Sequence, residues 1–250
     1  MPVNFFTSLL GKGKSERLND FSELFADMHS HFIPGIDDGS RDMDESLSLI
    51  RSMAELGFRK LITTPHIMSD SFRNTSSVIR EGLMKVKERL SSQSIHIELE
   101  AAAEYYLDDM FLQLLDEGDL LTFGREKYLL IEVSYINYPE NLNNIIFDIL
   151  VKGYTPVLAH PERYPFWGAK FEEYKKLKDM GLLFQMNIGS LSGYYGPDVK
   201  RTAEKLAANN MVDFLGSDAH HERHIAALQK SLHSKTVSTL VKQDMLNKKL

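Results

Sequence analysis

The sequence predicts an α/β fold in which strand–helix units repeat around a parallel sheet. Seven short apolar runs alternate with longer segments whose apolar residues recur at helical spacing. Histidines and carboxylates stand at or just after the C-terminal ends of these runs. A chain of 250 residues that is 43% hydrophobic can bury a full core, and it is long enough for one α/β barrel. One domain is a simpler expectation than two small ones.

Each apolar run is short and bounded by turn-forming or polar residues, as expected for buried strands. The expected strands are Phe25–Met28, Lys60–Thr64, His96–Ala101, Tyr128–Val133, Thr155–Ala159, Leu182–Ile188 and Val212–Gly216. The expected helices between them are Asp44–Leu56, Ser76–Leu90, Asp109–Leu115, Leu142–Lys152, Phe171–Met180 and Val199–Asn209. Gly57, Gly153 and Gly181 are placed to cap helix C-termini. Strand–helix repetition of this kind favours a parallel sheet.

Composition narrows the possible functions. A formal net charge of -6 gives no basic surface for wrapping nucleic acid, so we expect no nucleic-acid partner. The absence of cysteine excludes disulfides, thiolate metal sites and thiol nucleophiles, which leaves imidazole and carboxylate groups as metal ligands. No apolar run approaches the roughly 20 residues that span a bilayer. We therefore expect a cytoplasmic protein that does not cross a membrane.

The first residues differ in composition from the rest. Their apolar residues precede their basic residues, which reverses the charge order of a secretory signal, and no small-residue cleavage site follows. We expect an N-terminal extension over residues 1–22 that serves packing or partner docking. A single domain is expected over residues 23–250.

Residues of the types that bind metals recur at or just after the C-terminal ends of the expected strands. They are His29, His31, His66, Glu104, Glu132, His160, Asp218 and His220. The C-terminal rim of the strands is where βα barrels keep their chemistry. Two of the pairs, His29 with His31 and Asp218 with His220, are spaced by two residues, so their side chains point the same way from an extended chain. The pattern predicts one multinuclear metal site gathered from the whole chain.

Six strings carry a resemblance to a known family. They read DMHSHFIPGIDDG from Asp27 to Gly39, then ITTPH, AAEYY, LIEVS, LAHPERY and GSDAH. In this order they resemble the polymerase-and-histidinol-phosphatase (PHP) superfamily, and within it the bacterial protein-tyrosine phosphatases of capsule and exopolysaccharide operons. The resemblance covers about Phe25 to Leu228. It implies a distorted seven-stranded, (β/α)7 TIM-like barrel that holds three divalent metal ions, usually manganese, with iron or zinc as alternatives.

The same resemblance assigns the ligands. His29, His31, Glu104 and Asp218 would hold one ion, and Asp38, His66 and His220 a second. Glu132 and His160 would hold a third, with Glu104 bridging. The implied partner is a phosphotyrosine protein, the tyrosine-rich tail of a bacterial tyrosine kinase that acts in polysaccharide biosynthesis and export.

The chemistry of phosphoester hydrolysis fits this assignment. Closely spaced metals can make a nucleophile from water, neutralise the phosphoryl oxygens and assist the leaving group. A bridging hydroxide would attack in line while Arg163 clamps the phosphoryl oxygens, with Arg223 as a second candidate. A metal-bound water or His221 would assist the leaving oxygen.

Several residues have an alternative, structural interpretation. Asp37 and Asp38 both suit a turn, and the family pattern favours Asp38 as the ligand. Asp27 is expected to be a buried acceptor that orients a ligand histidine. Tyrosines that could stack on a substrate ring or simply pack are Tyr105, Tyr106, Tyr135, Tyr138, Tyr194 and Tyr195. His224 stays open, whereas His96 and His233 are expected to be ordinary. Tyr105 replaces a basic residue that relatives commonly carry.

Two other functions remain alternatives to a protein-tyrosine phosphatase. The first is a small-molecule phosphatase of the histidinol-phosphatase type, with the same metals but a closed pocket. The second is a non-catalytic or nuclease-type PHP module. A complete ligand set opposes a catalytically dead module, and the acidic charge opposes a nuclease role.

Overall fold

The computed structural model describes residues 17–168 and 170–250, and its strands are all parallel. One sheet has the order β1-β2-β4, with β1 at Ala26–Asp27, β2 at Lys60–Thr63 and β4 at Glu98–Ala101. The second has the order β3-β5-β6-β7-β8-β9, with bounds His66–Ile67, Glu104–Tyr106, Tyr128–Glu132, Thr155–Ala159, Leu183–Asn187 and Phe214–Gly216. The predicted parallel α/β fold is confirmed, since strand residues lie within or directly after all seven expected runs.

Two of the expected strands continue past a break, which is why the structure divides the strands between two sheets. Thr64 and Pro65 separate β2 from β3, and Ala102 and Ala103 separate β4 from β5. Pairing resumes beyond each break, because β3 pairs with β5 as β2 pairs with β4. The breaks therefore leave the strand order intact.

The first and last strands are not joined by a continuous ladder in the described chain. They meet at a parallel bridge between Ser30 and Ala219. Further down, the buried side-chain amide of Asn247 donates to the carbonyls of Ala26 and Leu215, at 2.9 and 2.7 Å. Its oxygen accepts from the Leu215 N–H at 2.9 Å. One side chain thus satisfies backbone groups on both β1 and β9.

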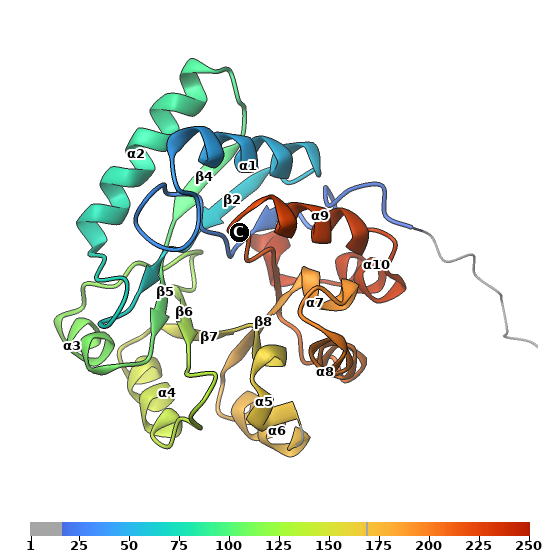
Figure 1. The fold of residues 1–250 in the computed structure, drawn as a ribbon. Helices are drawn as coiled ribbons and strands as arrows, with labels where there is room; N and C mark the ends of the chain where they lie inside the picture. Colours follow the sequence, from blue (N-terminus) through green and yellow to red (C-terminus); the bar gives the residue numbers. More distant parts are fainter. Residues whose placement is uncertain (1–16, 169) are drawn as a thin grey trace, which may run out of the picture.

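Helices surround the strands on the outside (Figure 1). They are α1 Met43–Glu55, α2 Ser76–Ser92, α3 Asp109–Glu117, α4 Leu142–Val151, α5 Pro165–Gly168, α6 Phe171–Asp179, α7 Ile188–Ser192, α8 Pro197–Ala208, α9 Glu222–Ser231 and α10 Lys235–Lys242, with short 3-10 turns η1 Pro161–Arg163 and η2 Leu246–Lys249. Asp42, Thr75 and Asp108 cap α1, α2 and α3 by accepting a backbone N–H from within the first turn. The three predicted capping glycines have the positive φ that suits the residue after a helix.

The structure forms two helices, α9 and α10, after Asn209, where none was predicted. Ile225, Leu228, Val237, Leu240 and Val241 are buried on these helices. They join the core cluster that also holds the apolar residues of α1. This last helical pair therefore completes the outer layer between α1 and α8 (Figure 1).

The interior between the strands holds its own apolar cluster, which includes Met28, Ile62, Leu130, Val157 and Phe214. Two larger clusters lie between strands and helices. The apolar interior fills the centre of the strands below the polar residues at their C-terminal ends, and so the site rests on a packed floor.

Residues 1–16 of the expected N-terminal extension lie outside the described chain. Of the residues that follow, Leu18 and Phe21 are buried in the core cluster of α1. The Phe21 N–H donates to the Leu56 carbonyl at 2.7 Å, which fixes this segment at the end of α1. Within the described residues, no helix is both long and apolar enough to cross a membrane.

Candidate metal centre

All nine predicted metal ligands come together in one cluster, with Asp38 in the loop between β1 and α1 and the others at or just past strand ends. Four overlapping groups have ligand atoms within 4.8 Å of one another: His31, Asp38, His66 and His220; His29, His31 and Glu104; His29, His160 and Asp218; and His66, Glu104 and Glu132. The members come from strand ends between β1 and β9. Seven of the nine are buried, His220 is half-buried and only Asp38 is exposed.

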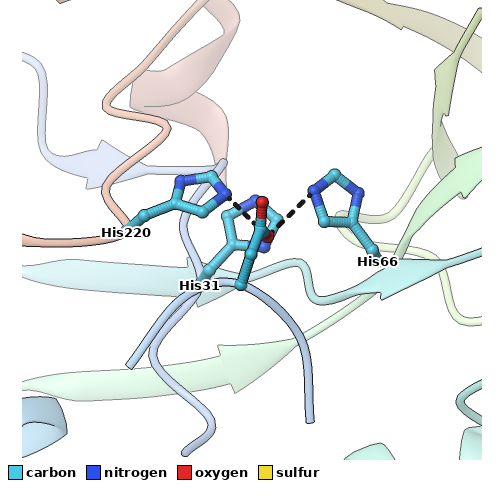
Figure 2. Close-up of side chains that lie close together, drawn as sticks. His31, His66 and His220 are labelled. Atoms are coloured by element: carbon cyan, nitrogen blue, oxygen red, sulfur yellow. Dashed lines mark ion pairs between the residues drawn. The ribbon is translucent and has the colours of Figure 1, made fainter. Parts of the chain in front are cut away.

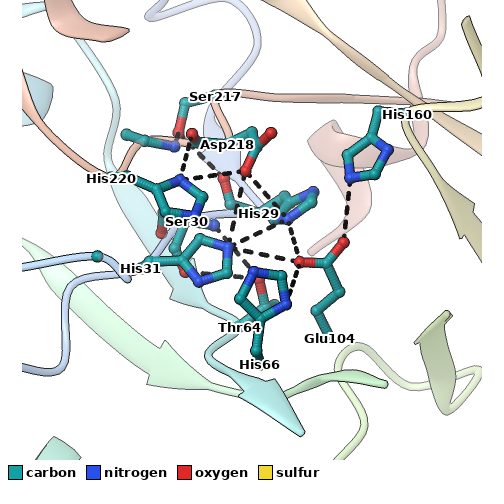
Figure 3. A network of polar contacts seen from close by, with 12 residues as sticks. His29, Ser30, His31, Thr64, His66, Glu104, His160, Ser217, Asp218 and His220 are labelled. Atoms are coloured by element: carbon teal, nitrogen blue, oxygen red, sulfur yellow. Dashed lines mark hydrogen bonds and ion pairs between the residues drawn. The ribbon is translucent and has the colours of Figure 1, made fainter. Parts of the chain in front are cut away.

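Glu104 lies at the centre of the cluster. Its Oε2 is 3.1 Å from His29 Nε2 and 3.3 Å from His66 Nδ1. Its other oxygen, Oε1, is 3.2 Å from His160 Nε2. Figure 3 shows the carboxylate of Glu104 facing His29 and His66 on one side and His160 on the other. The two oxygens can therefore serve two different ions.

Asp38 faces the imidazoles of His66 and His220. Its Oδ1 is 3.5 Å from His66 Nε2 and 3.2 Å from His220 Nε2. His31 lies between these two rings, with centroids 4.6 Å from His66 and 3.9 Å from His220 (Figure 2). The neighbouring Asp37 takes a different role. It is buried, and its Oδ2 lies 2.7 Å from His31 Nδ1, which leaves His31 Nε2 to face the cluster.

Two candidate ligands have left-handed backbone conformations that are uncommon for residues other than glycine. His160 has φ 34° at the end of β7, and Asp218 has φ 52° after β9. Such backbone strain concentrates at functional sites, where the surrounding structure imposes it. Here β7 ends in the η1 turn directly after His160, and the Asp218 N–H is held by the His29 carbonyl at 2.8 Å.

Burial and neighbouring charges shift the pKa values of the clustered side chains in different directions. Burial would raise the pKa of Glu104, but the imidazoles of His29 and His66 hold it well below its usual range. Burial and the charge of Glu104 raise the pKa of Glu132 to about 8. Burial lowers the pKa of His160 to about 4, and Arg163 acts in the same direction. Burial would also lower the pKa of His29, yet Glu104 and Asp218 raise it to about 9.

These residues fit divalent metal ions. The buried His66 Nδ1 has no hydrogen-bond partner, although it lies 3.3 Å from Glu104 and 3.8 Å from Glu132. A cation between the carboxylates would relieve the repulsion that raises the pKa of Glu132. The donor set is imidazole nitrogen and carboxylate oxygen without sulfur, which suits manganese, iron or zinc. The site is thus built to bind metal.

A cavity of about 370 Å³ opens directly over the cluster. Seven candidate ligands line it: Asp38, His66, Glu104, Glu132, His160, Asp218 and His220. The other lining residues are Met68, Phe72, Tyr135, Arg163, Tyr195, His221 and His224. Arg163 Nη1 donates to Asp218 Oδ2 at 2.9 Å. Its guanidinium lies 5.0 Å from the ring centre of Tyr135 and 4.4 Å from that of Tyr195. The two rings hold the cation in place at the cavity wall.

The other two predicted catalytic residues lie further out. Arg223 is exposed and lines a neighbouring cavity of about 690 Å³ between α1 and α9. His221 lines both cavities and stacks on His224 at 4.2 Å. Its Nδ1 is buried without a partner, and burial together with His220 lowers its pKa. Of the three predicted catalytic residues, Arg163 contacts a candidate ligand, His221 lines the cavity over the cluster, and Arg223 lines the outer cavity alone.

Three further side chains near the cluster have structural roles, and one of them, Asp27, differs from its expected role. Tyr105 points into the core, where its hydroxyl accepts the Leu121 N–H at 2.7 Å, so it offers no substrate contact. Asp27 accepts from the N–H and hydroxyl of Ser217 at 2.7 and 2.8 Å, and it thus anchors the end of β9 instead of a histidine. His224 is buried, and its Nδ1 accepts the His220 N–H at 3.2 Å. These groups support the cluster without joining it.

Four residues near the cluster were not predicted from the sequence. Phe72 stacks on His66 with ring centres 5.5 Å apart, and the backbone of Met68 pairs with that of Phe72 through an antiparallel bridge. Gln185 and Asn187 on β8 are fully buried and hydrogen-bonded to candidate ligands. A pair of amides spaced by two residues in an otherwise apolar strand was the available signal, because buried amides need partners.

Taken with the parallel strands, the ligand cluster and its arginine define a metal-dependent hydrolase site on a barrel-like α/β scaffold. A family model described as "Capsular polysaccharide synthesis, CpsB/CapC" matches residues 25–245. The chain belongs to the CpsB/CapC family.

Curated relatives and solved structures agree with the family. The tyrosine-protein phosphatase YwqE of Bacillus subtilis is 31% identical over 78% of this chain and 77% of its own. The tyrosine-protein phosphatase CpsB of Streptococcus agalactiae is 28% identical over 78% of this chain and 82% of its own. A chain from the structures of YwqE and Streptococcus pneumoniae CpsB, described as metal-dependent tyrosine phosphatases, is 28% identical, covers 88% of both chains and has a TM-score of 0.79. Histidinol phosphate phosphatase of Lactococcus lactis, at 12% identity, 83% and 91% coverage and a TM-score of 0.53, shares the fold.

Proposed function

We propose that this chain is a metal-dependent phosphatase that hydrolyses phosphotyrosine in proteins. The observation that carries the proposal is the cluster of nine metal-type side chains, seven of which line one 370 Å³ cavity together with Arg163. The relatives named as tyrosine-protein phosphatases support the same activity.

The proposed cofactors are three divalent ions, with manganese preferred over iron or zinc. One would be held by His29, His31, Glu104 and Asp218, one by Asp38, His66 and His220, and one by Glu132 and His160 with Glu104 bridging. His31 also approaches the Asp38 group and His160 the Asp218 group, which suits closely spaced ions. Such ions activate water and neutralise charge on the phosphoryl group.

The chain's own groups would bind and orient the substrate. Arg163 would place its free guanidinium nitrogens on the phosphoryl oxygens, since only Nη1 has a carboxylate partner. Phe72 and Tyr195 would hold the phenyl ring, because they line the cavity beside the cluster. His221, at the border of both cavities, would donate a hydrogen bond to the leaving phenolic oxygen. Arg223 would contact the substrate further from the phosphate.

The shape of the surface favours a protein substrate. The 370 and 690 Å³ cavities share Asp38, His220 and His221, so they form one continuous depression that runs between α1 and α9. A phosphotyrosine in the inner cavity would leave room for flanking residues in the outer one. We propose the tyrosine-rich tail of a bacterial tyrosine kinase of polysaccharide biosynthesis and export as the substrate. The activity would be cytoplasmic, where ATP-dependent tyrosine phosphorylation takes place.

A direct comparison of substrates tests the proposal. The protein is stripped with a chelator, reloaded with manganese, and assayed on a phosphotyrosine peptide, a phosphoserine peptide of the same sequence and histidinol phosphate. The proposal expects metal-dependent turnover with kcat/KM highest on the phosphotyrosine peptide. Preference for histidinol phosphate would make the chain a small-molecule phosphatase, and absence of turnover on all three substrates would contradict a phosphatase.

A further inference from the structure

Strand β8 is unusual among the strands because it brings no histidine or carboxylate to the cluster. It carries Gln185 and Asn187 instead, two neutral amides that are both fully buried. Residues spaced by two on a strand face the same side, so both amides point toward the candidate ligands. A buried amide is costly to desolvate unless its groups are hydrogen-bonded, which makes the partners of these two side chains informative.

The hydrogen bonds of Gln185 fix the orientation of its amide. Its Oε1 lies 3.3 Å from the backbone N–H of His160 and 2.7 Å from His29 Nδ1. A backbone N–H can only donate, so the atom it meets must be the amide oxygen. That oxygen can only accept, and His29 Nδ1 must therefore carry a proton. The other ring nitrogen of His29, Nε2, is then the atom left for a metal, and it faces Glu104 and Asp218 at 3.1 and 3.5 Å.

The chain of hydrogen bonds continues in one direction. Gln185 Nε2 donates to Asn187 Oδ1 at 2.9 Å, and Asn187 Nδ2 donates to Asp218 Oδ2 at 2.7 Å. Arg163 and the Tyr195 hydroxyl also contact Asp218 Oδ2, at 2.9 and 3.3 Å. Asp218 Oδ1 is left facing His29. This chain of hydrogen bonds, called the relay below, therefore begins at His29 and ends at Asp218, two candidate ligands of the same ion.

The neighbouring strand is shaped to leave room for this relay. Gly216 on β9 packs against it so closely that an added Cβ would lie 2.6 Å from Gln185 Nε2 and 2.8 Å from His29 Cβ. A Cβ atom does not approach another non-bonded heavy atom to less than about 3.0 Å, so any larger side chain here would displace the amide or the histidine. Glycine at this position therefore leaves the space that Gln185 and His29 occupy.

We propose that Gln185 and Asn187 form a positioning relay for the metal centre. Gln185 holds His29 in the Nδ1-protonated tautomer, and Asn187 transmits the same hydrogen-bond direction to Asp218. Because both groups are neutral amides, the relay orients a histidine and a carboxylate without adding charge to an acidic cluster. The inference rests on the metal site of the proposed function, and it assigns roles to residues that do not themselves bind metal.

The first test uses the unmodified protein. Long-range 1H–15N correlation spectra of the metal-free protein at a pH above 9 report which ring nitrogen of each histidine carries the proton. The relay predicts the Nδ1-protonated tautomer for His29, which is identified by the loss of its signals in His29→Gln. An Nε2-protonated His29 would overturn the relay whether or not the protein binds metal.

The second test measures metal affinity in Gln185→Leu, Gln185→Glu and the matched control Gln113→Leu. Gln113 is exposed on α3, where its side-chain amide donates to Glu117 far from the metal cluster. Manganese binding is followed by equilibrium dialysis and elemental analysis, with circular dichroism as a check of folding. Loss of a group that orients a ligand weakens metal binding by roughly 10- to 100-fold. That loss is expected for one ion in Gln185→Leu, with partial rescue in Gln185→Glu, whose carboxylate still accepts from His29.

The outcomes separate the relay from the proposed function. Wild-type binding decides whether the metal site exists, and the ratio of variant to wild-type affinity decides whether the relay supports it. Equal affinity in Gln185→Leu and wild type would overturn the relay, as would an equal loss in Gln113→Leu. If Gln185→Leu does not fold, Gln185→Glu provides the ratio of affinities. A variant affinity below one-tenth of wild type would also overturn the relay if His29 is not Nδ1-protonated in the wild-type protein.

Discussion

Replacement of Arg163 by alanine should lower turnover far more than it lowers metal binding. The guanidinium lies against Tyr135 and Tyr195 at the wall of the cavity and gives one N–H to Asp218. When it is removed, Asp218 Oδ2 keeps two donors, from Asn187 at 2.7 Å and Tyr195 at 3.3 Å, and so the carboxylate stays oriented. What is lost is a cation that would contact the phosphoryl oxygens as negative charge gathers on them.

The expected size of the effect follows from this position. Removing one preorganised electrostatic contact to a transition state costs about 10²-fold or more in kcat, which is about 2.7 kcal/mol. Arg163→Lys should recover only part of it, because a lysine lacks the planar fork and cannot stack between two tyrosine rings in the same way. Manganese content and phosphotyrosine-peptide kinetics are measured together for the wild type, Arg163→Ala and Arg163→Lys. Unchanged kinetics in Arg163→Ala would refute a phosphate-binding role, and loss of metal would make the arginine a structural support for Asp218.

Three further predictions concern Phe72 at the cavity wall, Glu104 at the centre of the cluster, and Asn247 between β1 and β9. Phe72→Ala should lower kcat/KM for a phosphotyrosine peptide by about 2- to 10-fold, which is the contribution of one aromatic contact, and should leave kcat/KM for a small alkyl phosphate unchanged. The control is Phe147→Ala, at an exposed position on α4. An equal loss on both substrates would contradict a ring-binding role for Phe72. Glu104→Gln should keep the fold, as seen by circular dichroism, but lose metal and activity, since its carboxylate faces three imidazoles; near-native turnover at limiting metal would show that it bridges no ions. Asn247→Leu should destabilise the protein by roughly 3 kcal/mol or more in urea unfolding, because it orphans backbone groups of β1 and β9 that cost about 1–3 kcal/mol each. The exposed Asn209→Leu should change stability little, and equal stability of the two variants would mean that Asn247 does not join the strands.

The sequence predicted the strands and the clustering of the candidate ligands because both follow simple periodic rules. Apolar runs between helical segments mark buried parallel strands, and polar residues just past them meet at one edge of the sheet. His29 follows the first strand and Asp218 the last, and His29 Nε2 lies 3.5 Å from Asp218 Oδ1. Their common position just past a strand end predicted this proximity. Asp38 likewise reaches the cluster while Asp37 supports His31, a distinction that the local sequence alone left open.

The supporting parts of the site were harder to predict because they depend on tertiary contacts. Tyr105 follows a candidate ligand directly, yet alternation along β5 turns it into the core. Phe72 belongs to a tight loop with no strong pattern, and its position over His66 arises only when that loop folds back. Asn247 near the C-terminus bonds to strands that are distant in sequence. No periodic pattern marks such contacts.

The most direct test of the account measures bound metal and turnover on the same sample. The protein is purified without chelators, its transition metals are quantified, and phosphotyrosine-peptide hydrolysis is followed as metal is removed and manganese is returned. The account predicts about three ions per chain, loss of turnover on chelation, and recovery in proportion to the manganese bound. Protein that binds no transition metal, or that turns over equally well after complete chelation, would contradict the central claim that these nine side chains form a catalytic metal centre.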